Sequence, residues 1–309
     1  MNFPNIHGLN IIPIPGNIFL LKQLNPPFRF SCSDGLLILP MKGRNRQTIV
    51  LDANVEPRFV NKINKIYGPI SDYICSHGHM DHIAHVHQWE RIGAKIHAPK
   101  QEASNLLQLK KFYDCYGINK SVSYKDIEKF GKLNKYLSCG KVLNFNPGTT
   151  LEFENLKIKT IPLTAHSISH VGFYLKNERL LHISCLGFDK KGPEEDGFGP
   201  WYGFQQCSLK QYLKDIQYAM NLYQSNCKTL TSSHSYVVEK NDLTPFDYMR
   251  RKIKENHLRI QKSLKNSTII LKKEKTENVI QKLLKKDMFF PKEKMTGFFF
   301  FQYYSRIFE

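Results

Sequence analysis

Residues 75–82, with the sequence CSHGHMDH, place three histidines and one aspartate within six positions, directly after an apolar run. One loop offers few partners for so many polar side chains, whereas imidazole nitrogens are good ligands for zinc and related divalent metals. In an extended loop, His77 and His79 stand at alternate positions and point toward one centre. Asp81 and His82 then turn toward a second centre beside it. The loop therefore constrains the fold, because the chain must display these side chains where a strand ends.

The segments around this loop alternate between strand and helix patterns. Strands are expected where apolar residues run between turn signals, and helices where they recur at a spacing of three or four. The predicted elements are a hairpin over 35–53, a helix over 56–67 with Phe59, Ile63 and Ile66 at helical spacing, a strand over 71–75, a helix over 83–93 and a strand over 94–99. This alternation predicts an α/β sandwich.

The second half of the chain returns to strands after a less regular stretch. Residues 102–147 begin with a helical pattern and continue as polar segments without firm periodicity, which we interpret as an insertion. Strand patterns follow over 147–188, and a helical pattern covers 207–224. A strand-like stretch at 228–235 comes next, and the spacing beyond Leu243 is mostly helical.

Composition bounds the class of protein. The 309 residues suffice for one large domain with an appendage. The seven cysteines are odd in number and scattered, so we expect free thiols rather than a disulfide framework. The N-terminus lacks the features of a secretory signal, and the aromatic stretch at 298–304 is too short to span a membrane and reads as a strand or packing segment. These features predict a cytoplasmic protein without membrane association.

The net charge of +18 is densest near the C-terminus, where residues 241–309 carry 16 Lys and Arg against 8 Asp and Glu. Lysines that neutralise phosphates give sequence-independent affinity for nucleic acid, so nucleic-acid binding is one interpretation of this charge. No basic motif with interleaved aromatic residues accompanies the charge. A lysine-rich, solvated surface explains it more simply.

The H-x-H-x-D-H pattern at 77–82 resembles that of the metallo-β-lactamase superfamily, and the resemblance spans about residues 12–236. In that family a later histidine completes the first metal site and another closes the second, and AHSISHVGFYL and TSSHS match these places with His166 and His234. His170 is then structural. The resemblance implies a four-layer αββα sandwich over 1–240, interrupted by the insertion, with a mostly helical C-terminal extension over 241–309.

The resemblance also implies a site for two divalent ions, with zinc as the expected metal. Asp81 would both hold a metal and orient the attacking water. The implied metal ligands are His77, His79, Asp81, His82, His166, Cys185 and His234.

Cys185 departs from the family pattern, which usually has a bridging aspartate at this strand end. A thiolate is softer than a carboxylate and favours zinc over manganese or iron. Three interpretations are open: a zinc thiolate, a neutral thiol that leaves the second site weak, or a change that disables catalysis. The true β-lactamases also use a cysteine here, but His82 and the absence of an export signal argue against antibiotic hydrolysis.

The resemblance implies hydrolysis by metal-activated water but does not choose the substrate. A small ester, thioester or lactone is the first hypothesis, with a small-molecule substrate as the partner. An endoribonuclease or other phosphodiesterase is the second, because residues 250–286 resemble the helical C-terminal module of some ribonucleases in this superfamily. A catalytically impaired metal-binding protein is the third.

Overall fold

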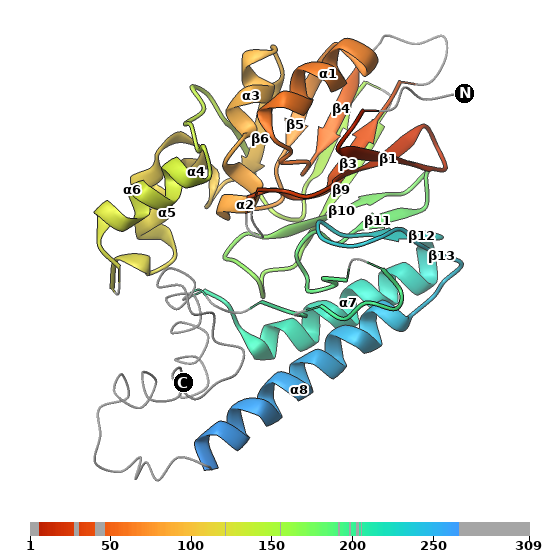
Figure 1. Cartoon of the computed structure of the whole chain (residues 1–309). Coiled ribbons are helices and arrows are strands. Elements are labelled where there is room, and N and C mark those ends of the chain that lie inside the picture. The colour runs from red at the N-terminus through yellow and green to blue at the C-terminus, as the bar shows by residue number, and fades with distance from the viewer. Residues whose placement is uncertain are drawn as a thin grey trace.

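Two β-sheets pack face to face in the computed structural model, with helices on both outer sides (Figure 1). The structure describes residues 6–27, 31–40, 47–120, 122–154, 156–190, 192–197, 199–201, 204 and 206–265. The expected four-layer αββα sandwich is confirmed over these residues. The aromatic stretch at 298–304 lies outside them.

The first sheet contains seven strands in chain order. Strands β1 to β4 are antiparallel neighbours, and β4 to β7 are parallel neighbours. The strands are β1 (Leu9–Ile14), β2 (Ile18–Gln23), β3 (Gly35–Ile38), β4 (Thr48–Leu51), β5 (Ile70–Ile74), β6 (Lys95–Pro99) and β7 (Leu143–Phe145). The antiparallel pair β3 and β4 confirms the hairpin predicted over 35–53.

The second sheet contains six strands in the order β13-β12-β11-β10-β9-β8. Its strands are β8 (Thr150–Phe153), β9 (Leu156–Pro162), β10 (Val171–Leu175), β11 (Leu180–His182), β12 (Thr229–Thr231) and β13 (Val238–Glu239). Neighbours are antiparallel except β11 and β12, which are parallel. The strand patterns predicted over 147–188 correspond to β8 to β11.

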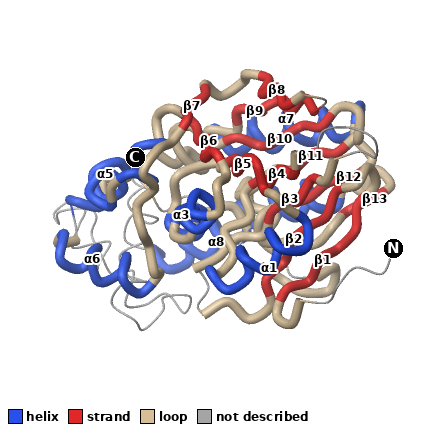
Figure 2. Tube along the Cα trace, turned by 90° about the horizontal axis from the view of Figure 1, so that it is seen from above, coloured by secondary structure: helices blue, strands red, loops and turns tan. Residues whose placement is uncertain are grey.

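Helices α1 and α3 cover the first sheet, and α7 and α8 cover the second (Figure 1). Helices α5 and α6 lie beside the sandwich in both views (Figures 1 and 2). The helical elements are α1 (Pro57–Tyr67), α2 (Met80–Ile83), α3 (Val86–Arg91), α4 (Ala103–Leu107), α5 (Leu109–Cys115), the 3-10 helix η1 (Ile118–Lys120), α6 (Tyr124–Leu133), α7 (Leu209–Asn226) and α8 (Thr244–Lys265). The helix predicted over 83–93 corresponds to α3, whereas α2 lies inside the predicted histidine loop and carries Asp81 and His82.

Apolar strand residues divide between two buried layers according to the period of two in a strand. Ile18 and Leu20 of β2 pack between the sheets, in the same cluster as Phe173 of β10. Phe19 and Leu21 of β2 join the other cluster, which includes the helices. Because this sheet is covered on both faces, its inner strands β3 and β4 are buried along their whole length.

Helix α1 buries a face that differs slightly from the predicted one. Phe59 and Ile63 are fully buried, as their spacing predicts, and Val60 and Tyr67 complete the face. Ile66 lies in the helix, as its spacing predicts, but is 38% exposed. The physical reason is the position of the apolar stripe, whose centre falls between Val60 and Ile63 and leaves Ile66 at its edge.

We expect Ile63→Ala to lower the free energy of unfolding by about 2–5 kcal/mol, because it leaves a cavity beneath α1. Ile66→Ala, the same change one turn away, should alter it by less than about 1 kcal/mol. Urea denaturation of the two variants measures the difference. Equal losses would contradict this placement of the helix.

Helix α8 packs against α7 and the second sheet. The rings of Tyr223 and Phe246 lie 5.9 Å apart, and Phe246, Met249 and Ile253 belong to the buried cluster that includes α7. The predicted helical character beyond residue 243 is thus confirmed as far as Lys265. Its resemblance to a ribonuclease module stays a prediction.

No helix among the described residues is long and apolar enough to cross a membrane. All seven cysteines are described and free, as expected.

Candidate metal centre

The candidate site lies where parallel strands of both sheets end at one edge. In the first sheet Leu51 of β4 pairs with Ile74 of β5, and in the second His182 of β11 pairs with Thr231 of β12. Because these pairs end in register, the residues that follow all four strands meet. The loop at 75–82 follows β5, Cys185 follows β11 and His234 follows β12. The seven residues predicted as metal ligands lie here in two neighbouring groups. Six of them form two sets that share Cys185 and have ligand atoms within 4.8 Å of one another, whereas the ring of His79 lies beside those of His77 and His166.

The first group contains His77, His79 and His166, all buried. Their ring centroids lie 4.4 Å apart for His77 and His79, 4.5 Å for His79 and His166 and 4.8 Å for His77 and His166. Each Nε2 atom is buried without a hydrogen-bond partner. Burial, followed by repulsion from neighbouring histidines, lowers the pKa of all three well below the usual value. Three neutral imidazoles with adjacent rings and unpartnered nitrogens are suited to a divalent metal.

The outer nitrogens of two of these rings are held by neighbouring groups. The Nδ1 of His77 lies 2.8 Å from Ser76 Oγ, and the Nδ1 of His166 lies 2.8 Å from the hydroxyl of Tyr212. Metal-binding histidines usually use their second nitrogen in this way, which fixes the ring and directs Nε2 to the metal.

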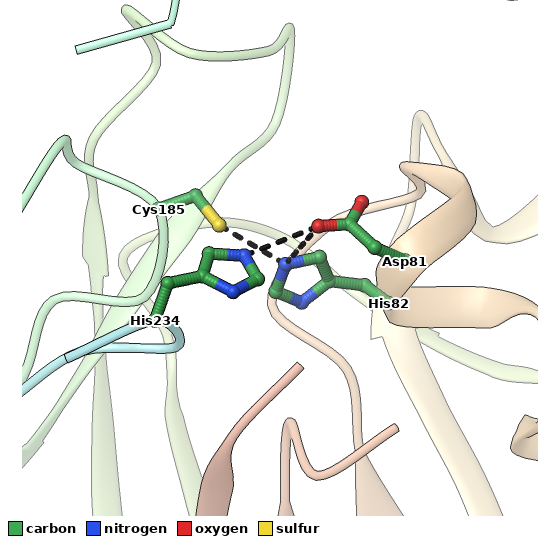
Figure 3. A group of neighbouring side chains, drawn as sticks. All are labelled: Asp81, His82, Cys185 and His234. Carbon is green, nitrogen blue, oxygen red and sulfur yellow. Dashed lines mark hydrogen bonds and ion pairs between the residues drawn. The ribbon is translucent and has the colours of Figure 1, made fainter. Parts of the chain in front are cut away.

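The second group contains Asp81, His82, Cys185 and His234, whose candidate ligand atoms lie within 4.8 Å of one another. Asp81 and His82 approach from the first half of the chain, and Cys185 and His234 from the second (Figure 3). His82 Nε2 lies 3.0 Å from Cys185 Sγ, and His234 Nε2 lies 3.1 Å from Asp81 Oδ2. Asp81, Cys185 and His234 are partly exposed, so this side of the site is open to a substrate.

Cys185 also belongs with the first group, because its sulfur lies within 4.8 Å of candidate ligand atoms of His77 and His166. Burial raises the pKa of its thiol, but attraction from His82 and His234 outweighs burial and lowers it. Burial lowers the pKa of His82, but Asp52 and Cys185 raise it well above the usual value. The thiolate is the form of cysteine that binds metals, so this environment favours a metal-binding Cys185.

Asp52, which the sequence-based search did not single out, organises the loops behind the site. It follows β4 and is fully buried. Oδ1 accepts hydrogen bonds from the Ser76 amide and His82 Nδ1, both at 3.0 Å. Oδ2 accepts hydrogen bonds from Ser184 Oγ at 2.7 Å and Ser233 Oγ at 2.9 Å. One carboxylate therefore contacts three loops that carry candidate ligands. The available sequence signal was an aspartate directly after an apolar strand.

The environment of Asp52 keeps it ionised. Burial raises its pKa, but His82 and His182 outweigh burial and hold the pKa well below the usual value. Asp52 and Ser184 both have left-handed backbone, with φ of 58° and 46°. This conformation costs about 1–2 kcal/mol for a non-glycine residue, and the hydrogen bonds around Asp52 offset that cost.

Asn54 explains why the helix after the histidine loop breaks. Its Nδ2 donates to the carbonyl of Asp81 at 2.6 Å, and its Oδ1 accepts from the amide of His85 at 2.8 Å. In a continuous helix the amide of His85 would instead bond the carbonyl of Asp81. The inserted side chain separates α2 from α3 and holds Asp81 and His82 in the short α2.

The remaining histidines have structural partners. The Nδ1 of His170 lies 2.8 Å from the carbonyl of Leu163, and its Nε2 accepts from the amide of Cys185 at 3.2 Å. Both nitrogens of His170 are therefore used, as its structural role predicts. His182 is buried beside Thr231, as expected for a core residue. His85 Nε2 lies 3.0 Å from the carbonyl of Asn134, His87 Nε2 lies 2.6 Å from Gln88 Nε2, and His97 Nε2 lies 2.7 Å from Asp72 Oδ1.

A scan against protein-family models finds no match, and a search of curated proteins finds none. Solved structures do match. A metallo-beta-lactamase family protein from Thermus thermophilus superposes with a TM-score of 0.63 at 14% identity, covering 97% of this chain and 92% of its own. The metallo-beta-lactamase from Pontibacter korlensis superposes with a TM-score of 0.54 at 15% identity, covering 80% of this chain and 99% of its own. DIM-1 metallo-beta-lactamase superposes with a TM-score of 0.55 at 17% identity, covering 82% of this chain and 100% of its own.

These likenesses agree with the two packed sheets and their outer helices, and with the meeting of strand ends at one edge. This chain therefore has the metallo-β-lactamase fold.

Proposed function

We propose that this protein is a metal-dependent hydrolase that binds two zinc ions. His77, His79 and His166 would hold one ion, and Asp81, His82, Cys185 and His234 the other. The observation that carries the proposal is the set of three buried Nε2 atoms without hydrogen-bond partners, next to a second group of four candidate ligands. Without a metal, these three buried nitrogens would lose hydrogen bonds to water and gain nothing in return.

Divalent ions bound here would act as Lewis acids and lower the pKa of bound water toward about 7. The protein's own part is to hold and orient the reactants. Asp81 is suited to accept a proton or hydrogen bond from the attacking water, because its carboxylate is ionised at neutral pH. Burial raises the pKa of Asp81, but attraction from His82 and a hydrogen bond from His234 lower it to about 2.

We propose an ester, thioester or lactone as the substrate class. The partly exposed side of the site, formed by Asp81, Cys185 and His234, leaves room for a carbonyl group to approach. Ile168, two residues after His166, is 40% exposed and gives the His166 loop an exposed apolar side chain. An acyl or lactone ring carries the apolar surface that such a side chain favours.

Elemental analysis of protein purified without added metal tests the proposal first, and two zinc ions per chain would support it. Assays on a panel of thioesters, lactones, phosphodiesters and RNA then test the substrate class. Hydrolysis of RNA with no turnover of any ester would replace our proposal by the phosphodiesterase alternative. Bound zinc without turnover of any substrate would favour an impaired enzyme, and absence of bound metal after zinc reconstitution would refute the metal site.

A further inference from the structure

Glu102 is a fully buried carboxylate that touches none of the seven candidate ligands directly. It lies just before α4, in the segment predicted as an insertion. Its Oε1 accepts a hydrogen bond from the hydroxyl of Tyr116 at 2.7 Å, and its Oε2 accepts one from Ser169 Oγ at 3.0 Å. The backbone amide of Gly78 also donates to this carboxylate. A buried carboxylate is costly unless it is hydrogen-bonded, so its position here requires a reason other than packing.

Two partners of Glu102, Gly78 and Ser169, come from the two loops that carry the three-histidine group. Gly78 separates His77 from His79, and Ser169 lies three residues after His166. The hydrogen bonds of one side chain therefore connect both loops, although these are far apart in the sequence.

The neighbours of Glu102 hold the same loop from other directions. Asn105 Nδ2 reaches the carbonyl of Gly78 at 3.5 Å and the hydroxyl of Tyr116 at 3.1 Å. The ring of Tyr116 lies against that of His79, with centroids 4.8 Å apart. A Cβ at position 78 would come within 2.7 Å of Asn105 Nδ2 and 3.0 Å of Glu102 Cβ, so only glycine fits this close approach. The peptide between the two histidines is thus held at its amide, its carbonyl and its α-carbon.

We propose that Glu102 is a positioning residue for the three-histidine metal site. By bonding Gly78 and Ser169 together, it sets the separation between the His77–His79 loop and the His166 loop. The segment at 102–116 then acts as a support for the metal loop. This inference rests on the proposed function, since it assumes that the three histidines bind a metal.

The experiment is a zinc titration of metal-free protein against a chromophoric chelator. His234→Ala in the second group isolates the three-histidine site, and Glu102→Gln is then added to that background. Glutamine keeps the size of the side chain but removes its charge and one acceptor. We expect zinc affinity to fall by about 10–100-fold, the loss typical of residues that orient a ligand.

Glu56→Gln is the matched control, because Glu56 is also buried but bonds Gln23 and Arg58 instead of the histidine loops. Its zinc affinity should be unchanged even if both substitutions lower stability equally. A zinc affinity of Glu102→Gln equal to that of the control would overturn the inference. If Glu102→Gln does not fold, Ser169→Ala decides instead, because it removes only the bond to the His166 loop. Weaker zinc binding would support the inference, and unchanged binding would overturn it.

Zinc binding by the unmodified protein and by its His234→Ala variant distinguishes a failure of this inference from a failure of the proposed function. If neither the unmodified protein nor its His234→Ala variant binds zinc, the proposed metal site is wrong and the role of Glu102 falls with it. If both bind zinc and Glu102→Gln binds it equally well, the metal site stands and only the role of Glu102 is wrong.

Discussion

His166→Ala is expected to remove at least one zinc ion per chain and to lower hydrolysis by about 10³-fold. The Nε2 of His166 is one of three buried nitrogens, on adjacent rings, that have no hydrogen-bond partner, so its loss leaves only two histidines in that group. A bound metal contributes several kcal/mol of transition-state stabilisation, and about 4 kcal/mol corresponds to about 10³ in rate. Elemental analysis and turnover of the best substrate from the panel measure both effects.

His97→Ala provides the matched control for this prediction. His97 lies on β6, where its Nε2 contacts Asp72 Oδ1 at 2.7 Å, away from both groups. This variant should keep both its zinc and its activity. If His166→Ala retained full zinc content and turnover while folding normally, the three histidines would not be a metal site.

The sequence predicts the site best where its residues are close together along the chain. His77, His79, Asp81 and His82 are predictable because one loop carries them all, and a loop can direct neighbouring side chains toward a common point. Asp52 and Glu102 are not predictable in this way, because their partners lie on segments distant in sequence. Only the folded sheets bring Asp52 to Ser184, or Glu102 to Ser169. Residues that orient ligands therefore stay hidden until the tertiary structure is known.

The fold shows the same division between local and tertiary information. Strands β3 and β4 are short apolar runs, β5 and β6 also carry apolar residues beside turn signals, and the predicted strands coincide with all four. Helix α6 was not predicted, because Gly131 and several lysines interrupt its apolar pattern. A local signal was nevertheless present, since Ser123 caps this helix by accepting a hydrogen bond from the amide of Asp126.

The resemblance leaves three interpretations of Cys185 open, and the surroundings of its thiol favour a metal-binding thiolate. Its sulfur is 3.0 Å from His82 Nε2 and within reach of candidate ligands of both groups. Its backbone amide donates to His170 Nε2, which fixes the start of the loop after β11. Attraction from His82 and His234 outweighs burial and lowers the pKa of the thiol. A neutral, inert thiol would need apolar surroundings, whereas these surroundings favour the charged form.

Cys185→Ser is accordingly expected to reduce zinc content from two ions to one and to weaken the second site by more than about 100-fold. A serine hydroxyl stays neutral at pH 7 and is a poor zinc ligand, so this loss should exceed that of a residue that only orients a ligand. Chelator titration of both zinc ions measures it. Retention of both ions at unchanged affinity would show that Cys185 is not a ligand.

Cys185→Asp should instead retain two ions, because a carboxylate keeps the negative charge and offers two oxygens to the metals. Its preference should shift from zinc toward manganese, since oxygen is a harder ligand than sulfur. Competition between the two metals, with the unmodified protein as the reference, measures the shift.

Turnover then distinguishes a working zinc thiolate from a cysteine that disables catalysis. If the aspartate variant hydrolyses a substrate that the unmodified protein binds but does not turn over, cysteine at this position has disabled catalysis. If the unmodified protein is the faster enzyme with zinc, the thiolate is part of a working site, and its softness selects the metal.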